Sequence, residues 1–138
     1  MTRVNKLLLA GTFFCVALTT SCTDENSNPS NDDRDAFTGS WTCAETSKQF
    51  GNSTYAVTIS STGEIDSVSI KNFYQLGNGV SAIALVSGNS ITIPFQDVSG
   101  GIEIHGTGLM NSNSNKIDFT YYADDAGVID TVTATYNK

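Results

Sequence analysis

From residue 36 to residue 138, large apolar side chains recur at every second position within short runs. Val57 and Ile59, for example, alternate with Thr58 and Ser60. Such alternation of β-branched and aromatic residues is typical of strands that bury one face. No segment of this part of the sequence carries an apolar stripe with the helical period. The pattern therefore predicts an all-β domain over residues 36–138.

Turn residues separate the runs at short intervals. Gly51-Asn52 and Gly88-Asn89, for example, lie between consecutive runs, and Gly and Asn supply the positive φ that tight hairpins need. The runs are centred on Trp41, Val57, Val68, Ile83, Ile93, Ile104, Phe119 and Val132. The short connections predict an antiparallel meander of about eight strands, folded as a small up-and-down β-barrel or, as the alternative, a β-sandwich.

The size of the side chains bears on whether such a barrel is filled or hollow. A barrel of short strands can fill its interior with its own side chains. Bulky residues occupy the positions that are expected to face inward: Tyr55, Ile59, Ile70, Ile93, Ile104, Phe119 and Tyr136. This favours a filled interior, with a ligand cavity as the open alternative.

Two segments depart from the simple pattern. Residues 80–86 are apolar on both faces, so we expect neighbouring elements to cover this run more fully. Pro94 lies within the run 91–95 and cannot donate to a strand ladder. It predicts a bulge, a strand end or an opening in the barrel wall.

The N-terminus has the three parts of a secretory signal. Arg3 and Lys6 precede an apolar run over residues 7–18, and small polar residues follow it. As a helix this run would reach only about 18 Å, whereas the hydrocarbon core of a bilayer is about 30 Å thick. The length and the flanks predict a cleaved signal peptide over residues 1–21.

The end of this signal resembles the lipobox of bacterial lipoproteins in Leu18-Thr19-Thr20-Ser21-Cys22. The resemblance implies that Cys22 is acylated and becomes the first residue of an outer-membrane lipoprotein, although Thr19 departs from the leucine that the pattern prefers. Two acyl chains are needed for stable anchoring, and the acylated cysteine of this family supplies them.

Residues 22–35 follow as a lipidated cysteine and an acidic stretch without large apolar side chains. Such a composition predicts a flexible, solvated tether. Thr23-Asp24-Glu25 also resembles the acidic export signal of surface lipoproteins of the Bacteroidetes type, which implies exposure on the cell surface.

Charge and cysteine content exclude several kinds of partner and bond. Loss of residues 1–21 removes Arg3 and Lys6, which leaves 5 basic and 14 acidic residues, a net charge of −9. Such a chain is a poor partner for nucleic acid. Cys43 is the one cysteine in residues 36–138, so we expect no disulfide there and assign Cys43 to packing.

The sequence carries no catalytic or metal-binding constellation. His105 is the one histidine of the chain, and the alternation places it on the outer face beside Glu103. A Ser-His-Asp triad or a zinc site needs more than this residue and Cys43, and Asp124-Asp125 lacks the spacing of a calcium loop. We therefore expect no enzyme activity, no metal and no cofactor.

Gly39-Ser40-Trp41 opens the first predicted strand and resembles the Gly-X-Trp signature of the calycins, which include the lipocalins. The resemblance implies that Trp41 closes one end of the barrel beside a basic residue after the last strand, here Lys138. The family more often has arginine at that place. The domain is thus similar to small lipocalin-like lipoproteins of Gram-negative bacteria.

Two functions fit these observations. The first is a membrane-anchored, non-catalytic protein that binds a small hydrophobic or amphipathic ligand in its barrel mouth. The candidate lining residues are Tyr55, Phe73, Phe95, Tyr121 and Tyr136. The alternative is a solid barrel that docks another cell-envelope protein through its outer face or its loops.

Two tripeptides, Asp66-Ser67-Val68 and Asp130-Thr131-Val132, resemble the O-glycosylation motif of exported Bacteroidetes proteins. The resemblance implies that Ser67 and Thr131 point outward.

Overall fold

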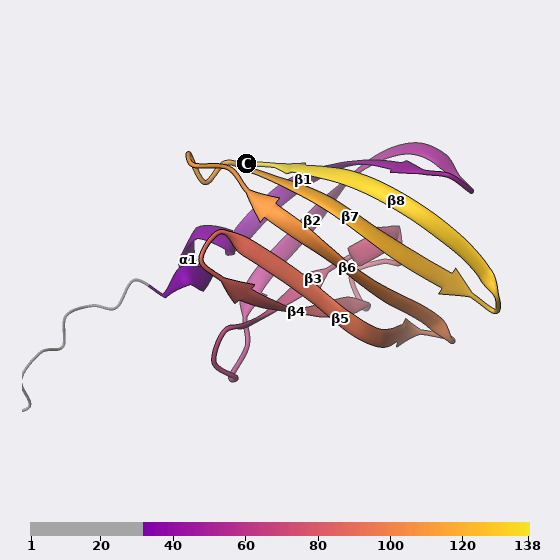
Figure 1. The fold of residues 1–138 in the computed structure, drawn as a ribbon, viewed down its shortest axis with the longest axis horizontal. Helices are drawn as coiled ribbons and strands as arrows, with labels where there is room; N and C mark the ends of the chain where they lie inside the picture. Colours follow the sequence, from indigo (N-terminus) through magenta and orange to yellow (C-terminus); the bar gives the residue numbers. More distant parts are fainter. Residues whose placement is uncertain (1–31) are drawn as a thin grey trace, which may run out of the picture. The chain divides into compact units, whose positions relative to one another are not determined.

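Eight strands follow one another around a closed antiparallel barrel in the computed structural model, which describes residues 32–138 (Figure 1). The strands are β1 (Gly39–Ser47), β2 (Gly51–Ser61), β3 (Ser67–Lys71), β4 (Ser81–Ser87), β5 (Ser90–Ser99), β6 (Ile102–Met110), β7 (Lys116–Asp125) and β8 (Val128–Asn137). A short helix α1 (Asp33–Phe37) precedes β1, and a 3₁₀ turn η1 (Phe73–Gln75) joins β3 to β4.

The barrel closes because β1 pairs with both β2 and β8. Each of the eight predicted runs falls within one strand. The barrel prediction is therefore confirmed, and the sandwich alternative is wrong. The predicted signal peptide, the predicted lipidation site Cys22 and most of the predicted tether lie outside the described residues.

Large side chains fill the middle of the barrel, as their size predicted. All seven residues predicted to face inward are buried. Two tilted aromatic pairs cross the interior, Phe119 with Tyr136 at 4.7 Å between ring centroids and Phe73 with Tyr121 at 4.6 Å. Each fully buried side chain of this size stabilises the fold by about 1.5–3 kcal/mol before entropy is counted.

Two glycines in β6 make room for these rings. A Cβ atom on Gly108 would lie 2.6 Å from the ring of Phe119, and one on Gly106 would lie 2.3 Å from Cβ of Tyr121. Gly106 and Gly108 face inward but have no side chain. The space above their backbone is therefore occupied by Tyr121 and Phe119 of β7.

Pro94 stands at a β-bulge in β5, one of the three outcomes that its sequence position allowed. The pairing of β5 with β6 shifts register between Ile93 and Gln96. The backbone pairing of β4 with β5 covers only three residue pairs, from Leu85 with Thr92 to Ser87 with Ser90. The part of β5 that follows the bulge therefore makes no backbone pairs with the start of β4. The Gln96 side chain bridges the gap: its Oε1 accepts from the Ile83 amide at 2.8 Å, and its Nε2 donates to the Ile83 carbonyl at 2.7 Å.

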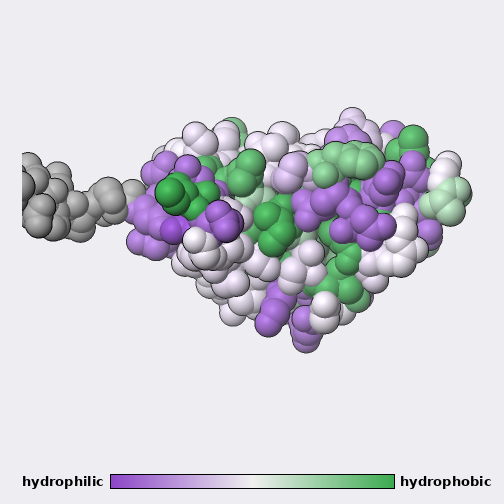
Figure 2. Space-filling model, turned by 90° about the horizontal axis from the view of Figure 1, so that it is seen from below, coloured by the Kyte–Doolittle hydropathy of each residue, from purple (hydrophilic) through white to green (hydrophobic). Residues whose placement is uncertain are grey.

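The outer face of β4 is not covered, contrary to the expectation for residues 80–86. Ile83 is 41% exposed and Leu85 is 48% exposed. The run is apolar on both faces, but only its inward residues are buried. Seen from below, hydrophobic side chains interrupt a largely hydrophilic surface (Figure 2).

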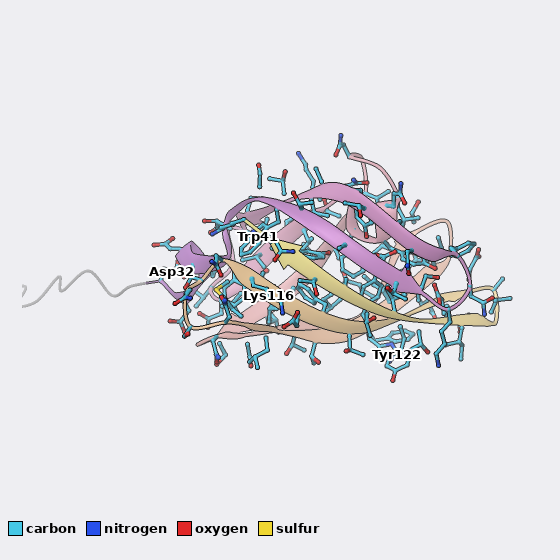
Figure 3. All side chains as sticks on the ribbon, turned by 90° about the horizontal axis from the view of Figure 1, so that it is seen from above. Asp32, Trp41, Lys116 and Tyr122 are labelled. Atoms are coloured by element: carbon cyan, nitrogen blue, oxygen red, sulfur yellow. The ribbon has the colours of Figure 1, made fainter. Side chains whose placement is uncertain are left out.

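The end of the barrel at which the chain enters is closed by side chains, and we call it the closed end. Phe37 of α1 is fully buried, and Trp41 at the start of β1 is 2% exposed. The Trp41 Nε1 donates to the Phe37 carbonyl at 2.7 Å, and the Lys138 Nζ lies 4.5 Å from the centroid of the Trp41 ring. Figure 3 shows Trp41 at the α1 end of the barrel.

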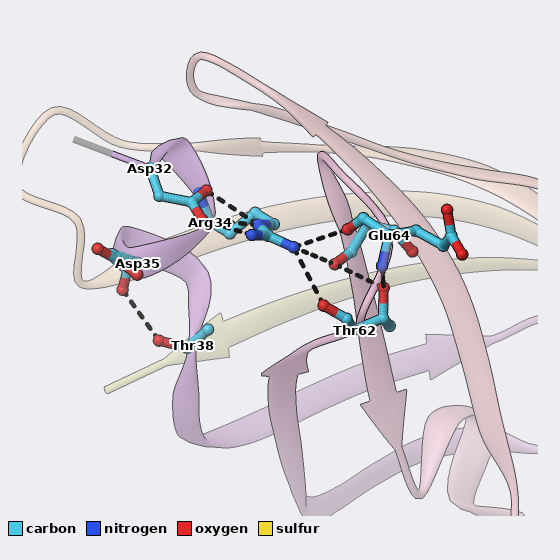
Figure 4. Close-up of polar contacts among 7 residues, drawn as sticks. Asp32, Arg34, Asp35, Thr38, Thr62 and Glu64 are labelled. Atoms are coloured by element: carbon cyan, nitrogen blue, oxygen red, sulfur yellow. Dashed lines mark hydrogen bonds and ion pairs between the residues drawn. The ribbon is translucent and has the colours of Figure 1, made fainter. Parts of the chain in front are cut away.

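Helix α1 is fastened to the barrel by its polar side chains (Figure 4). Asp32 caps the helix by accepting from the Arg34 amide at 3.0 Å. The Arg34 guanidinium donates to the carbonyl of Glu64 at 2.8 Å and also reaches the carbonyls of Thr62 and Ser67. Residues 32–35, which the sequence pattern assigned to the flexible tether, therefore belong to the folded unit. Arg34 binds the β2–β3 loop, and the Asp33 carboxylate accepts from the Gly88 amide between β4 and β5.

None of the helices within residues 32–138 is long and apolar enough to cross a membrane.

Candidate functional site

The end of the barrel opposite α1 carries a hollow, and we call this end the mouth. Here β1 turns into β2, β5 into β6 and β7 into β8, and η1 lies between β3 and β4. The hollow has a volume of about 450 Å³. Its lining residues are Glu45, Phe50, Ser53, Tyr74, Gln75, Leu76, Ile102 and Asp125. Both apolar and acidic side chains thus face the same space.

A buried carboxyl group forms the floor of the mouth. Glu45 lies on β1 in phase with Trp41 and Cys43, so its side chain points into the barrel, and it is 6% exposed. The hydroxyls of Tyr55 and Tyr121 both donate to Oε2 of Glu45 in short hydrogen bonds. No hydrogen bond from the described residues reaches Oε1, and Glu45 is among the residues that line the mouth.

The two tyrosines are fixed as donors. Burial is the main cause that raises the pKa of Tyr55 and of Tyr121 far above the ordinary value. A raised pKa keeps both hydroxyls protonated near neutral pH, so they act as donors to Glu45. Within residues 32–138, no lysine or arginine forms an ion pair with Glu45.

A second acidic residue, Asp130, holds the Tyr74 side chain of η1 at the wall of the mouth. The carboxylate is buried at the start of β8 and accepts from Ser47 Oγ at 2.5 Å, from the Tyr74 hydroxyl at 2.7 Å and from the Lys48 amide at 2.9 Å. Burial acts to raise the pKa of Asp130, but these hydrogen bonds outweigh it and lower the pKa below its ordinary value. Asp130 thus fixes Tyr74 from outside the hollow.

The backbone around η1 is unusual. Asn72, Tyr74 and Gln75 all have left-handed backbone angles, with φ of 60°, 53° and 56°. Non-glycine residues adopt this region at a cost of about 1 kcal/mol each. Asn72 offsets part of that cost, because its side chain donates to the Ala56 carbonyl and accepts from the Gly77 amide, each at 2.8 Å. The segment is thereby folded over the mouth and presents Tyr74 to it.

Deeper in the barrel, below Glu45, lies a pair of buried groups that the mouth does not reach. The Tyr136 hydroxyl is fully buried and has no hydrogen-bond partner among residues 32–138. Cys43 is fully buried as well, and burial raises the pKa of its thiol to about 12. Such a thiol is inert, which agrees with the packing role predicted for it.

Of the five candidate ligand-binding residues, the structure brings four together inside the barrel and leaves one outside. Tyr55 and Tyr121 bind Glu45 beneath the mouth, Phe73 packs on Tyr121, and Tyr136 lies deeper. Phe95 is 66% exposed on the outer surface, because the bulge at Pro94 changes the direction of the side chains that follow. None of the five is among the side chains that line the hollow.

The residues that do line the mouth were missed by the sequence reasoning. Glu45 could have been found, because strict alternation from Trp41 and Cys43 turns a carboxyl group inward. Phe50 and Tyr74 could not, since they lie in a turn and a 3₁₀ segment, where no periodicity fixes the direction of a side chain.

The outer surface carries two further hollows. One of about 570 Å³ lies over β1, β2, β7 and β8, and several threonines are among its lining residues. Another of about 290 Å³ is lined by Phe95, Glu103, His105, Tyr122, Asp124 and Ile129. The His105 ring stacks on Tyr122 with 5.0 Å between centroids. His105 is therefore exposed on the outer face, as predicted.

Other predicted positions are settled by the geometry. Gly39, Trp41 and Lys138 lie together at the closed end, where a Cβ on Gly39 would be 3.8 Å from Cε of Lys138. Ser67 is only 5% exposed, so it is not accessible to modification as the motif implies, although it alternates with the inward-facing Val68 and Ile70. Thr131 is half-buried. Within residues 32–138, no group of three His, Cys, Asp or Glu side chains lies close enough to hold a metal ion.

Comparisons with known proteins bear on the fold. No protein-family model matches the chain, and no curated protein matches it. The solved structure of EF1p2_mFAP2b bound to DFHBI is similar, with a TM-score of 0.58 and 13% identity over 78% of this chain and 97% of that chain. A redesigned beta barrel is also similar, with a TM-score of 0.56 and 12% identity over 78% of this chain and 95% of that chain. The chain thus shares the closed eight-stranded barrel of these structures.

Proposed function

We propose that this chain is a non-catalytic binding protein whose barrel mouth holds a small amphipathic molecule. The observation that carries the proposal is the mouth itself. Its volume of about 450 Å³ lies within the range of small-molecule sites, which combine apolar walls with a few polar groups. Phe50, Leu76 and Ile102 supply the apolar walls, and Glu45 supplies a polar group at the floor.

The similar structures support this proposal. EF1p2_mFAP2b has the same barrel fold and is bound to DFHBI. In addition, Trp41 and Lys138 meet at the closed end, as the resemblance to the calycins implies. We therefore propose a lipocalin-like barrel with its ligand at the mouth.

The same proposal includes a membrane anchor. An acylated Cys22 would hold the protein at the outer membrane, and the acidic segment after it would favour export to the cell surface. Labelling of cells with an alkyne-bearing fatty acid tests the anchor: we expect the label on the natural chain and its loss in Cys22→Ser. Protease treatment of intact cells then tests exposure, because a surface protein is cleaved and a periplasmic protein is not.

A binding role rather than catalysis fits the distribution of chemical groups. His105 is exposed on the outer face, and the Cys43 thiol is buried with a raised pKa. The groups that line the mouth include the Glu45 carboxyl group, the Tyr74 side chain and the apolar side chains of Phe50, Leu76 and Ile102. These groups can bind and orient a molecule.

Native mass spectrometry of the full chain, purified from the cells that make it, tests the proposal. We expect a bound small molecule, and we expect Phe50→Ala and Tyr74→Ala to lose it. Phe95→Ala is the matched control, because it removes a similar ring from the outer surface. An occupant that survives both mouth substitutions, or the absence of any occupant, would speak against the proposal.

The alternative, docking of another envelope protein, is favoured by one observation. Phe95 is 66% exposed and Ile129 is 60% exposed, and both line the outer hollow beside His105 and Tyr122. On this alternative, Phe95→Ser and Ile129→Ser abolish binding of a defined protein partner, and Phe50→Ala leaves that binding intact.

A further inference from the structure

We infer that the molecule bound at the mouth is an organic cation, with an ammonium or guanidinium group on a small apolar body. The inference rests on the proposed function and adds the charge of the ligand to it. It is carried by the surroundings of Glu45 at the floor of the mouth.

The Glu45 carboxyl group is desolvated but is not neutralised by the protein. The side chain is 6% exposed, and a buried carboxylate without a partner of opposite charge is unfavourable. The two tyrosine hydroxyls both donate to Oε2. They satisfy one oxygen, whereas no hydrogen bond from residues 32–138 reaches Oε1, and Glu45 lines the hollow.

Within residues 32–138, no basic side chain forms an ion pair with Glu45 or lines the mouth. Arg34 pairs with Asp32, Lys116 pairs with Asp118, and Lys138 lies over Trp41 at the closed end. The other two basic residues, Lys48 and Lys71, are exposed. The side chains that line the mouth include two acidic residues, Glu45 and Asp125, and no basic one. An anionic ligand such as a fatty acid would be repelled by this lining.

The walls complement the floor. Phe50 and Tyr74 line the hollow as an edge-to-face pair with 6.2 Å between ring centroids. Aromatic faces attract ammonium and guanidinium groups as well as apolar bodies. A carboxyl oxygen below and two aromatic rings beside it are therefore groups that together recognise an amine.

Three compounds of nearly equal shape and different charge test the inference: tryptamine, a cation; tryptophol, which is neutral; and indole-3-acetate, an anion. Each is titrated into the full chain, and binding is followed by shifts of the backbone amide NMR signals of the mouth segments. We expect tryptamine to bind at least about tenfold more tightly than tryptophol, because a close pair of opposite charges is strong in a partly buried site. We expect indole-3-acetate to bind most weakly.

Two substitutions separate the Glu45 carboxyl group from the overall negative charge. Glu45→Gln keeps the shape and an acceptor for the tyrosine hydroxyls, and we expect it to bind tryptamine and tryptophol equally. Glu103→Gln removes the same charge from the outer face of β6, and we expect it to keep the preference for tryptamine.

The outcomes distinguish this inference from the proposed function. If tryptophol binds at the mouth as tightly as tryptamine, or if Glu45→Gln keeps the preference for the cation, the inference is wrong and the binding role stands. If none of the three compounds shifts the signals of the mouth segments, both the inference and the proposed site are overturned.

Discussion

The side-chain nitrogen of Lys138 lies 4.5 Å from the centroid of the Trp41 ring and donates a hydrogen bond to the Ala36 carbonyl at 2.7 Å. Trp41 in turn donates to the Phe37 carbonyl at 2.7 Å. Two residues from opposite ends of the folded unit thereby tie helix α1 and the C-terminus to the start of β1. This contact closes the barrel at the end away from the mouth.

Removal of the Lys138 charge should weaken this closure modestly. Lys138→Met keeps an aliphatic side chain over the ring, and we expect the free energy of unfolding to fall by about 0.5–1 kcal/mol, the value of an exposed cation–π contact. Trp41→Phe also loses the indole hydrogen bond and leaves a void in the core. We therefore expect this substitution to lower the free energy of unfolding by about 2–4 kcal/mol. Urea unfolding measures both. Lys71→Met is the control, and equal effects of Lys138→Met and Lys71→Met would show that the contact contributes nothing.

Alanine at Gly108 should destabilise the barrel because the interior has no room for it. The added methyl group would lie 2.6 Å from Phe119 and 2.8 Å from Ile91, and overpacking of this kind costs about 1–3 kcal/mol. Gly106→Ala should cost more, because its new Cβ would lie 2.6 Å from the Thr120 carbonyl oxygen, which is backbone. Thermal unfolding followed by circular dichroism measures the loss. Gly79→Ala meets no atom within 4 Å and should unfold at the temperature of the natural chain.

The Gln96 side chain should protect the edge of β4 from exchange with solvent. Its amide group makes both hydrogen bonds that a paired strand would make to Ile83. We expect Gln96→Ala to lower the free energy of unfolding by about 1 kcal/mol, since water replaces part of the lost bonds. Amide exchange of Ile83 should quicken at least about fivefold, while that of Leu85, which pairs through the backbone with Thr92, stays unchanged. Equal exchange at Ile83 in both proteins would contradict the bridge.

Asp130 should make the fold sensitive to acid. Its folded pKa lies below the ordinary 3.8, so its hydrogen bonds stabilise the folded state above pH 3.8, and this stabilisation is lost as the pH falls through the folded pKa. Asp130→Asn should therefore lower stability near neutral pH and flatten its decline below about pH 4. Melting temperatures between pH 2.5 and pH 6 measure the slope. Asp118→Asn is the control. It removes an exposed carboxylate whose pKa is also lowered. We expect this substitution to flatten the decline less, because exposed ion pairs contribute little to the free energy of unfolding.

The barrel could be predicted because side-chain alternation and turn chemistry act locally and agree along the whole of residues 36–138. Each of the eight runs became a strand. Closure was also within reach, because a Gly-X-Trp signature at the first strand implied a barrel with Trp41 at one end. The exposed side of β4 could not be predicted. Ile83 and Leu85 face water, but nothing in their own run distinguishes them from buried residues.

The candidate site was predicted only in part, for physical reasons that differ between residues. Tyr55 and Tyr121 were placed near it by alternation, but their partner Glu45 was overlooked in the same alternation. Tyr74 owes its position to a left-handed backbone and to the hydrogen bond that its hydroxyl donates to Asp130, 56 positions away in sequence, and neither leaves a local pattern. Helix α1 was missed for a similar reason, because Arg34 is held by carbonyls of the β2–β3 loop.

The chain enters the barrel at the end away from the hollow, and this determines how the protein bears mechanical load. A pull on the N-terminal side of residue 32 reaches α1 first and is taken up by the Arg34 and Asp33 hydrogen bonds to neighbouring loops and by the buried Phe37. The segments around Glu45 lie at the other end of the strands and carry none of this force directly. A pull on the N-terminal side of α1 therefore acts on the closed end of the barrel before it reaches the mouth.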